Sequence, residues 1–131
     1  MDSNSEIAVK TAAAHLVAAF ARHDREAYFA CFAPEATFVF HNISHRLETR
    51  EEYLREWQRW EMEDGFHVES CLSTAQRVQW FGDIAVFTHS VLTEIGTKRG
   101  KVKLNERETI VFQSRPGQGW IAVHEHLSPV D

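Results

Sequence analysis

Hydrophobic residues recur along this chain with two different periods, and the period changes near residue 65. The first part has helical spacing. A capping box, Ser3-Asn-Ser-Glu6, precedes a predicted first helix. Asp24 can cap a short second helix, which we expect to end near Phe32 because Pro34 disfavours helical backbone at the residue before it. The apolar positions of the first helix are Ile7, Ala14, Val17, Ala18 and Ala21.

A short strand and a third helix are predicted next. The run from Ala36 to Phe40 is typical of a strand. A second capping box, Thr49-Arg-Glu-Glu52, opens a helix that we expect to continue to about Glu63 and to stop at Gly65. Tyr53, Trp57 and Trp60 share one face of this helix at three- and four-residue spacing, so this face is expected to pack inward.

After Gly65 the pattern becomes that of a sheet. Four long strands are predicted over residues 66–81, 84–95, 101–114 and 120–128, with turns at the glycine-containing segments between them. Helices followed by an antiparallel meander indicate an α+β fold in which the helices cover one face of the sheet. A chain of 131 residues is expected to form one domain, residues 1–131.

The last predicted strand alternates strictly between two faces. Ile121, Val123 and Leu127 are predicted to point toward the core, and Ala122, His124, His126 and Ser128 to point away. Glu125 falls on the apolar side. Burying a carboxyl among aliphatic side chains is costly unless it is paired or used, so Glu125 is a candidate functional residue.

Turn lengths predict the neighbours of Glu125. The turn at 96–100 places His89 opposite Glu106 or Glu108, and the turn at 115–119 places Glu125 opposite Glu108 or Ile110. His89, Glu108 and Glu125 are therefore the candidate catalytic residues. Two close carboxyls raise the apparent pKa of the pair, which suits proton transfer at a carbon next to a carbonyl. The alternative is structural: paired or hydrated glutamates and a hydrogen-bonded core histidine.

A pocket beside these residues would be lined by the inward face of the sheet and by the loop after the first strand. His41 can reach in from the rim, and one aromatic residue of the third helix can line the cavity. The residues predicted to contact a ligand are His41, Trp57, Phe87, Val91, Ile110 and Leu127.

His124 and His126 are expected on the outer face of the sheet. A His-x-His pair on a strand is a recurrent start to a metal site, but the sequence positions no third ligand, and we expect no metal. The favoured interpretation is a subunit interface formed by Arg107, Trp120, His124 and His126. A single β-bulge in the strand would invert this assignment of faces.

Composition excludes several partners. Fourteen basic against 19 acidic residues give a net charge of −5, which argues against nucleic acid. No apolar run approaches the roughly 20 residues that span a bilayer. Cys31 and Cys71 lack metal spacing and suggest reduced thiols, with a single disulfide as the alternative. Together with a polar start and no basic leader, this predicts a cytoplasmic protein.

The order of elements, the segment Phe32-Ala-Pro-Glu-Ala-Thr37 and the ending Val123-His-Glu-His-Leu-Ser128 resemble the nuclear-transport-factor-two-like superfamily, in its SnoaL-like and ketosteroid-isomerase-like branch. The ending also resembles that of the association domain of calcium/calmodulin-dependent kinase II. The resemblance implies a cone-shaped, curved, mostly antiparallel sheet wrapped by about three N-terminal helices, and commonly a homodimer. The superfamily's functions are diverse, so the fold alone does not select one.

Two functions are therefore expected to compete. The first is binding of a small, mostly apolar molecule in the cone, with cofactor-free isomerase, cyclase or lyase chemistry. The second is a non-catalytic association module whose sheet face exists to form a homodimer. A roomy cavity with titratable groups favours the first, and a collapsed apolar core favours the second. The aspartate base and tyrosine donor of known ketosteroid isomerases are not recognisable in this sequence.

Overall fold

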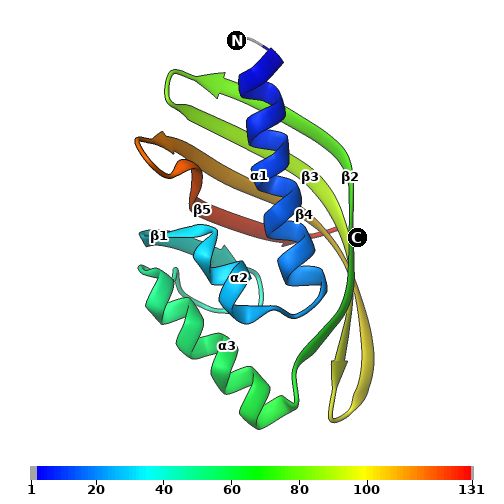
Figure 1. Ribbon diagram of the computed structural model, residues 1–131. Helices are drawn as coiled ribbons and strands as arrows, with labels where there is room; N and C mark the ends of the chain where they lie inside the picture. The colour runs from blue at the N-terminus through cyan, green and yellow to red at the C-terminus, as the bar shows by residue number, and fades with distance from the viewer. Residues whose placement is uncertain (1–2, 131) are drawn as a thin grey trace.

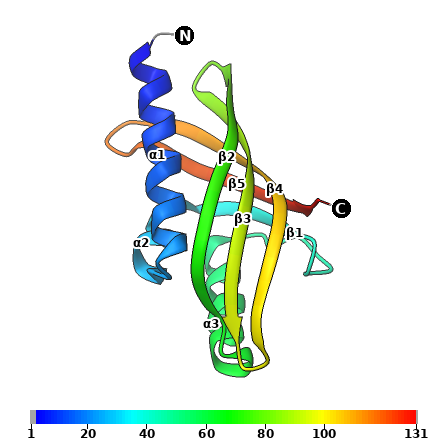
Figure 2. The same ribbon diagram turned by 90° about the vertical axis from the view of Figure 1, so that its right-hand side faces the viewer.

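The helices lie on one side of a strongly curved sheet. A computed structural model of the protein describes residues 3–130. Its elements are α1 (Ser3–Ala21), α2 (Arg25–Ala30), β1 (Phe32–Phe40), α3 (Arg50–Asp64), β2 (His67–Phe81), β3 (Ile84–Thr97), β4 (Gly100–Arg115) and β5 (Gly119–Pro129). Figures 1 and 2 show the long strands β2, β3 and β4 bending past α1, with all three helices gathered at the concave side.

The five strands form one sheet in the order β1-β5-β4-β3-β2. Successive strands from β2 to β5 pair antiparallel, whereas β1 pairs with β5 in parallel. The predicted α+β class and mostly antiparallel sheet are confirmed. The sheet is open, so β1 and β2 are its edges.

The helix boundaries follow from their caps. The Asp24 side chain accepts a hydrogen bond from the Ala27 backbone N–H at the start of α2, and Thr49 does the same for Glu52 at the start of α3. Gly65 ends α3 in a left-handed conformation, with φ of 65°. The helix predicted to end near Phe32 ends instead at Ala30.

Strand β1 begins at Phe32, earlier than the predicted Ala36. Its register against β5 shifts between Phe32 and Thr37, and the exposed Pro34 and Glu35 lie in this irregular part. Proline is tolerated here because β1 is an edge strand and loses no ladder hydrogen bond on its free side.

A bulge in β5 overturns part of the predicted facing. Val111 pairs with His124 and Phe112 with Ala122, so Val123 is an extra residue. Ala122 is consequently buried in the core, contrary to the prediction, and Ile121 pairs with Gln113 on the outer side. The bulge also places Trp120 on the inner face, contrary to the prediction. Its ring packs there against that of Trp80, beside the core, with ring centroids 5.9 Å apart.

An aromatic cluster fills the space between the helices and the sheet. Trp57 is fully buried, and its ring meets that of Phe66 edge to face at a centroid distance of 4.9 Å. Tyr28 and Phe29 of α2 and Phe38 of β1 belong to the same cluster. This core holds α2 and α3 against the sheet and fixes the walls of the adjoining cavity. No helix among the described residues is long and apolar enough to cross a membrane.

Candidate functional site

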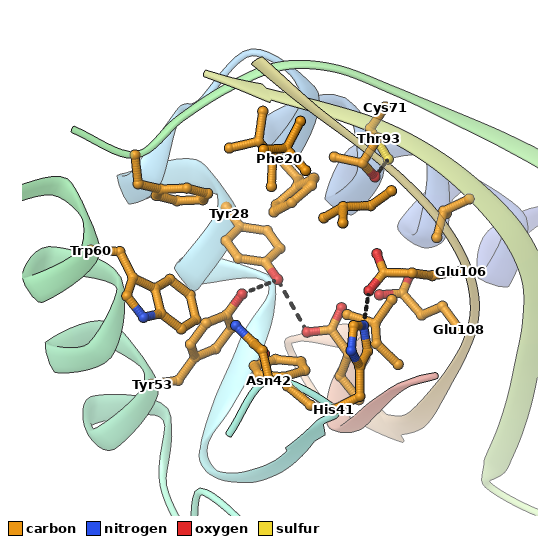
Figure 3. A pocket seen from close by; sticks show the side chains of 18 of the residues that line it. Phe20, Tyr28, His41, Asn42, Tyr53, Trp60, Cys71, Thr93, Glu106 and Glu108 are labelled. Carbon is orange, nitrogen blue, oxygen red and sulfur yellow. Dashed lines mark hydrogen bonds and ion pairs between the residues drawn. The ribbon is translucent and has the colours of Figure 1, made fainter. Parts of the chain in front are cut away.

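A cavity of about 290 Å³ opens on the concave side of the sheet. Much of its wall is apolar, formed by Leu16 and Phe20 of α1 and by inward-facing residues of β3, β4 and β5. Figure 3 shows the polar side chains that reach into it from several elements. The polar lining residues used below are Tyr28, His41, Asn42, Tyr53, Glu106, Glu108 and Glu125.

Strand register places the acidic residues side by side. His89 pairs with Glu108 across β3 and β4, and Ile110 pairs with Glu125 across β4 and β5, which is one of the two alternatives that each turn length allowed. Because side chains alternate along a strand, Glu106, Glu108 and Ile110 share the concave face with Glu125. The exposed fractions of Glu108 and Glu125 are 7% and 2%, so neither carboxyl is solvated as a surface glutamate would be.

Hydrogen bonds join Glu125 to two tyrosines. The Tyr28 hydroxyl donates to Glu125 Oε1 at 3.1 Å. The Tyr28 and Tyr53 hydroxyl oxygens lie 2.9 Å apart. Because the Tyr28 O–H already donates a hydrogen bond to Glu125, the Tyr53 O–H donates the one between the two tyrosines. Figure 3 shows this chain running from α3 through α2 to the sheet.

A second chain of hydrogen bonds reaches Glu108 along the same face of the sheet. His89 Nε2 lies 2.6 Å from Glu108 Oε1, and His89 Nδ1 lies 2.6 Å from Ser73 Oγ. Ser73 accepts a hydrogen bond from Gln76 Nε2, which leaves its own proton to donate to Nδ1. This assigns the Nε2–H tautomer to His89, with Nε2–H donating to the Glu108 carboxylate.

The pKa shifts distinguish the two carboxyls. Burial raises the pKa of Glu125 well above its usual value, and the neighbouring Glu108 raises it further. Burial also raises the pKa of Glu108, but a hydrogen bond from Glu125 opposes that rise. Burial lowers the pKa of His89 to about 4, so its imidazole is neutral at pH 7. The arrangement therefore favours a protonated Glu125 that donates to an ionised Glu108.

A third carboxyl forms a separate pair. Glu106 Oε2 is hydrogen-bonded to His41 Nε2, which lies on the loop after β1. Both side chains line the cavity, and Figure 3 shows them meeting at its edge. Glu106 is buried, whereas the His41 side chain is partly exposed. The pair thus connects the cavity wall to the loop.

Comparison with known proteins identifies the fold family. The model of the SnoaL-like domain matches residues 9–131. The chain belongs to the SnoaL-like domain family. No curated protein matches it.

Several solved structures share the fold of this SnoaL-like domain at low sequence identity. A nuclear transport factor 2-like superfamily protein of Salmonella enterica is 16% identical with a TM-score of 0.85, covering 98% of this chain and 93% of that one. A Novosphingobium aromaticivorans protein named as a candidate aromatic ring hydroxylase is 18% identical with a TM-score of 0.83, covering 100% and 92%. The CaMKII hub of S. rosetta is 21% identical with a TM-score of 0.75, covering 94% and 95%.

The predicted ligand contacts of the SnoaL-like domain divide into two groups. His41, Val91 and Leu127 line the cavity. Trp57, Phe87 and Ile110 do not line it, because they are fully buried in the core behind the cavity wall. Trp60, on the same helical face as Trp57, lines the cavity in its place. His89 is likewise not a lining residue, although it contacts the lining residue Glu108.

Tyr28, Tyr53 and Glu106 lie in the cavity but were not among the predicted site residues. Glu106 shares a strand face with Glu108, and this alternation was the signal that could have identified it. The inward face of α3 included Tyr53 but did not separate it from Trp57. Tyr28 lies in a six-residue helix, too short for periodicity to orient it.

The outer face of the sheet carries three of the four residues predicted for a subunit interface. Arg107 is exposed, and His124 and His126 share its face, with ring centroids 6.4 Å apart. His124 Nδ1 lies 2.8 Å from the Thr37 hydroxyl oxygen, and partial burial lowers the pKa of this imidazole. Trp120 does not belong to this face, as the bulge in β5 requires. Residues 3–130 contain no group of three side chains arranged to hold a metal ion.

Proposed function

We propose that this SnoaL-like domain binds a small, mostly apolar molecule in the cavity and transfers a proton at a carbon next to a carbonyl. The observation that carries the proposal is the pair Glu108 and Glu125, buried side by side in a largely apolar cavity and held in different protonation states by their neighbours. A volume of about 290 Å³ lies near the lower end of small-molecule sites and favours a compact ligand.

The two carboxyls have complementary roles in the proposed step. Glu108 is the base, whose ionised oxygen removes the proton from the carbon. Glu125 is the acid. Its O–H, which donates to Glu108 in the free protein, turns to the carbonyl oxygen of the bound substrate and hydrogen-bonds it as negative charge develops there. Glu108 then returns this proton to another carbon of the substrate, which restores the original protonation states of both carboxyls. The transfer is balanced with these two side chains alone.

Neighbouring residues position the pair. Tyr28 and Tyr53 hold Glu125 through their relayed hydrogen bonds. His89, backed by Ser73, donates to Glu108 and keeps it ionised within the apolar wall. These groups act through the carboxyls, and their removal is expected to change the rate by misplacing Glu108 or Glu125.

Deuterium exchange tests the proposal without knowing the substrate. The protein is incubated in D₂O with a panel of small cyclic ketones and enones, and the loss of α-proton signals is followed by NMR. We expect exchange faster than the buffer blank for at least one compound, and a loss of about 10²-fold or more in Glu108→Gln. Glu94→Gln, on the outer face of β3, is the matched control. Exchange that is equal in the parent and in Glu108→Gln for the whole panel would reject the proposal.

We also propose that the domain is a homodimer formed through the outer face of β4 and β5. Val111 and His124 are only half-buried and lie on this face beside the exposed Arg107 and His126. A partner subunit would remove their apolar atoms from water. The fold shared with a CaMKII hub is consistent with association. Pocket chemistry and dimer formation involve opposite faces of the sheet, so both can occur in one protein.

A further inference from the structure

We propose that the ligand of the cavity carries a positively charged amine, attached to a compact aromatic or alicyclic body. This assignment rests on the cavity being the ligand site proposed above and adds the charge of the molecule that it accepts. The groups that recognise the amine are the Glu106 carboxylate and the surrounding aromatic rings.

The ionisable lining residues of the cavity are mainly acidic. Asp64, Glu106, Glu108 and Glu125 line the cavity, and among the described residues no lysine or arginine does. A concave site with carboxyl groups of one sign attracts cations and repels anions, because the surrounding low-dielectric walls concentrate the field. A carboxylate or phosphate ligand would find no cationic side chain there to neutralise it.

Glu106 has a free position for the amine. Its Oε2 is hydrogen-bonded to His41, whereas no described residue donates to Oε1. The residue is only 7% exposed and lines the cavity, and its Oε1 is not among the buried atoms that lack a partner, so this oxygen stays accessible to a molecule in the cavity. Figure 3 shows Glu106 reaching from β4 toward the interior of the cavity. An accessible carboxylate oxygen without a protein donor can accept a charge-assisted hydrogen bond from a ligand that brings an N–H and a positive charge.

Glu106 is distinct from the proposed proton-transfer pair. Glu108 receives its hydrogen bond from His89, and Glu125 receives its own from Tyr28. An amine bound at Glu106 therefore leaves both of these carboxyls in place for chemistry on the rest of the molecule.

The rest of the cavity fits the body of such a ligand. Tyr53 and Trp60 of α3 supply aromatic surface opposite Glu106 in Figure 3, and Phe66, just after this helix, also lines the cavity. The ring centroids of Trp60 and Phe66 are 5.6 Å apart, which makes one continuous apolar wall. Aromatic faces also attract cations, so the wall tolerates the charge as well as the body of the ligand.

Three probes of similar shape test the charge assignment. Calorimetric titrations at pH 7.5 compare 2-phenylethylamine, which is cationic, with the neutral 2-phenylethanol and the anionic 3-phenylpropionate. We expect the amine to bind at least tenfold more tightly than the alcohol, and the propionate not to bind over the same concentration range. This ranking requires only the parent protein.

Two variants locate the preference. Glu106→Gln is expected to reduce the ratio of amine to alcohol affinity to threefold or less while it keeps alcohol binding. Glu94→Gln removes the same charge from the opposite face of the sheet and should leave the ratio unchanged. Thermal melts establish that both variants are folded, and the ranking by the parent decides the assignment if Glu106→Gln does not fold.

The outcomes separate this inference from the proposed function. Equal binding of the amine and the alcohol overturns the charge assignment and leaves the cavity as a site for small apolar molecules. An amine preference that persists unchanged in Glu106→Gln rejects Glu106 as its cause. Failure of all three probes to bind overturns the amine assignment and also weakens the cavity's proposed role as a ligand site.

Discussion

Glu125 has hydrogen-bond partners but no cation, and this determines the effect of replacing it. Glutamine can accept from Tyr28 through its carbonyl oxygen and donate to Glu108 through its amide, so Glu125→Gln should keep the local geometry. Glu125→Leu removes a desolvated carboxyl and should also leave the fold intact. Thermal melts of both variants beside the parent provide the measurement. Clear losses of stability in both would show that Glu125 neutralises a basic side chain.

The raised pKa of Glu125 adds a pH dependence to the same comparison. The folded protein holds this proton more tightly than the unfolded chain, whose glutamate has a pKa of about 4.3. The parent should therefore lose stability as pH rises above about 4.3 toward the raised value. Glu125→Gln has no such proton, so its stability relative to the parent should increase between pH 5 and pH 8. Urea unfolding at several pH values measures this difference, and a constant difference would contradict it.

The pKa shift of His89 makes stability depend on pH in the opposite direction. Its pKa in the folded protein is about 4, below the unfolded value of about 6.5, so the stability due to its neutral form is lost as pH falls from 6.5 toward 4. Protonation of Glu125 works against this loss in part of the same range. His89→Gln, which keeps a donor toward Glu108, removes the histidine effect alone. Relative to this variant, the parent should lose about 3 kcal/mol at most between pH 7 and pH 4.

Chemical denaturation of the parent and His89→Gln at pH 7, 6, 5 and 4 gives the required difference. A difference that does not change with pH would mean that His89 has the same pKa in the folded and unfolded chains. Ser73 is unchanged in both proteins, so the hydrogen bond between Ser73 Oγ and the imidazole Nδ1 is lost only through the replacement of His89.

At the scale of elements, strand β2 contains a local strain that a glycine should relieve. Ala75 has φ of 53° in the irregular segment between Thr74 and Arg77, and its side chain is exposed. Left-handed backbone costs a non-glycine residue roughly 1–2 kcal/mol, which exceeds the entropic cost of glycine. Ala75→Gly is therefore expected to raise the free energy of unfolding by up to about 1 kcal/mol.

Ala14→Gly is the matched control for this prediction. Ala14 is also exposed but lies inside α1, where glycine should lower the free energy of unfolding by about 1 kcal/mol. The same chemical change should thus have opposite signs in the two elements. Urea unfolding of the three proteins measures both effects, and destabilisation of similar size in both variants would contradict the strain at Ala75.

Elements with local signals were predictable from the sequence. The caps at Asp24 and Thr49 and the left-handed Gly65 act within a few residues, and all three occur where the pattern placed them. Turn length limited the partners of His89 and Glu125 to two residues each, and the observed register is among these alternatives. The bulge at Val123 was not predictable, because it depends on how β5 fits β4 and β1 together, and its consequence was the wrong face for Trp120 and Ala122.

The candidate site was predictable only where it lies on the sheet. Strand alternation oriented Glu108 and Glu125, since neighbouring strands fix side chains two residues apart on one face. The tyrosines come from α2 and α3, whose positions over the sheet depend on the aromatic core. Periodicity shows which residues of a helix share a face but not which of them reaches a cavity. The prediction therefore named Trp57 as a ligand contact, whereas Trp60 on the same face lines the cavity.

At the scale of the whole molecule, the curvature of the sheet gives its two faces different tasks. The concave face, covered by helices, holds the carboxyls in a largely apolar cavity. The convex face at β4 and β5 has no helix over it and carries partly buried residues such as Val111 and His124. Because the strands join both faces, a subunit that covers the convex face would also limit movements of the strands that carry Glu108 and Glu125.

The proposed dimer makes a direct prediction for this convex face. We expect the parent to sediment as a dimer at micromolar concentration in ordinary salt, with well over about 1,000 Å² buried in total, the usual minimum for a specific interface. His126→Glu places a negative charge at this face and should raise the dissociation constant at least tenfold, since like charges opposed across an interface are unfavourable. The effect should be larger at pH 8, where neutral histidines offer the new carboxylate no counter-charge.

His15→Glu, at an exposed position of α1, makes the same substitution away from the face and should sediment as the parent does. A parent that is monomeric under these conditions would remove the basis for assembly through this face, and equal weakening by both variants would place the contact elsewhere on the molecule.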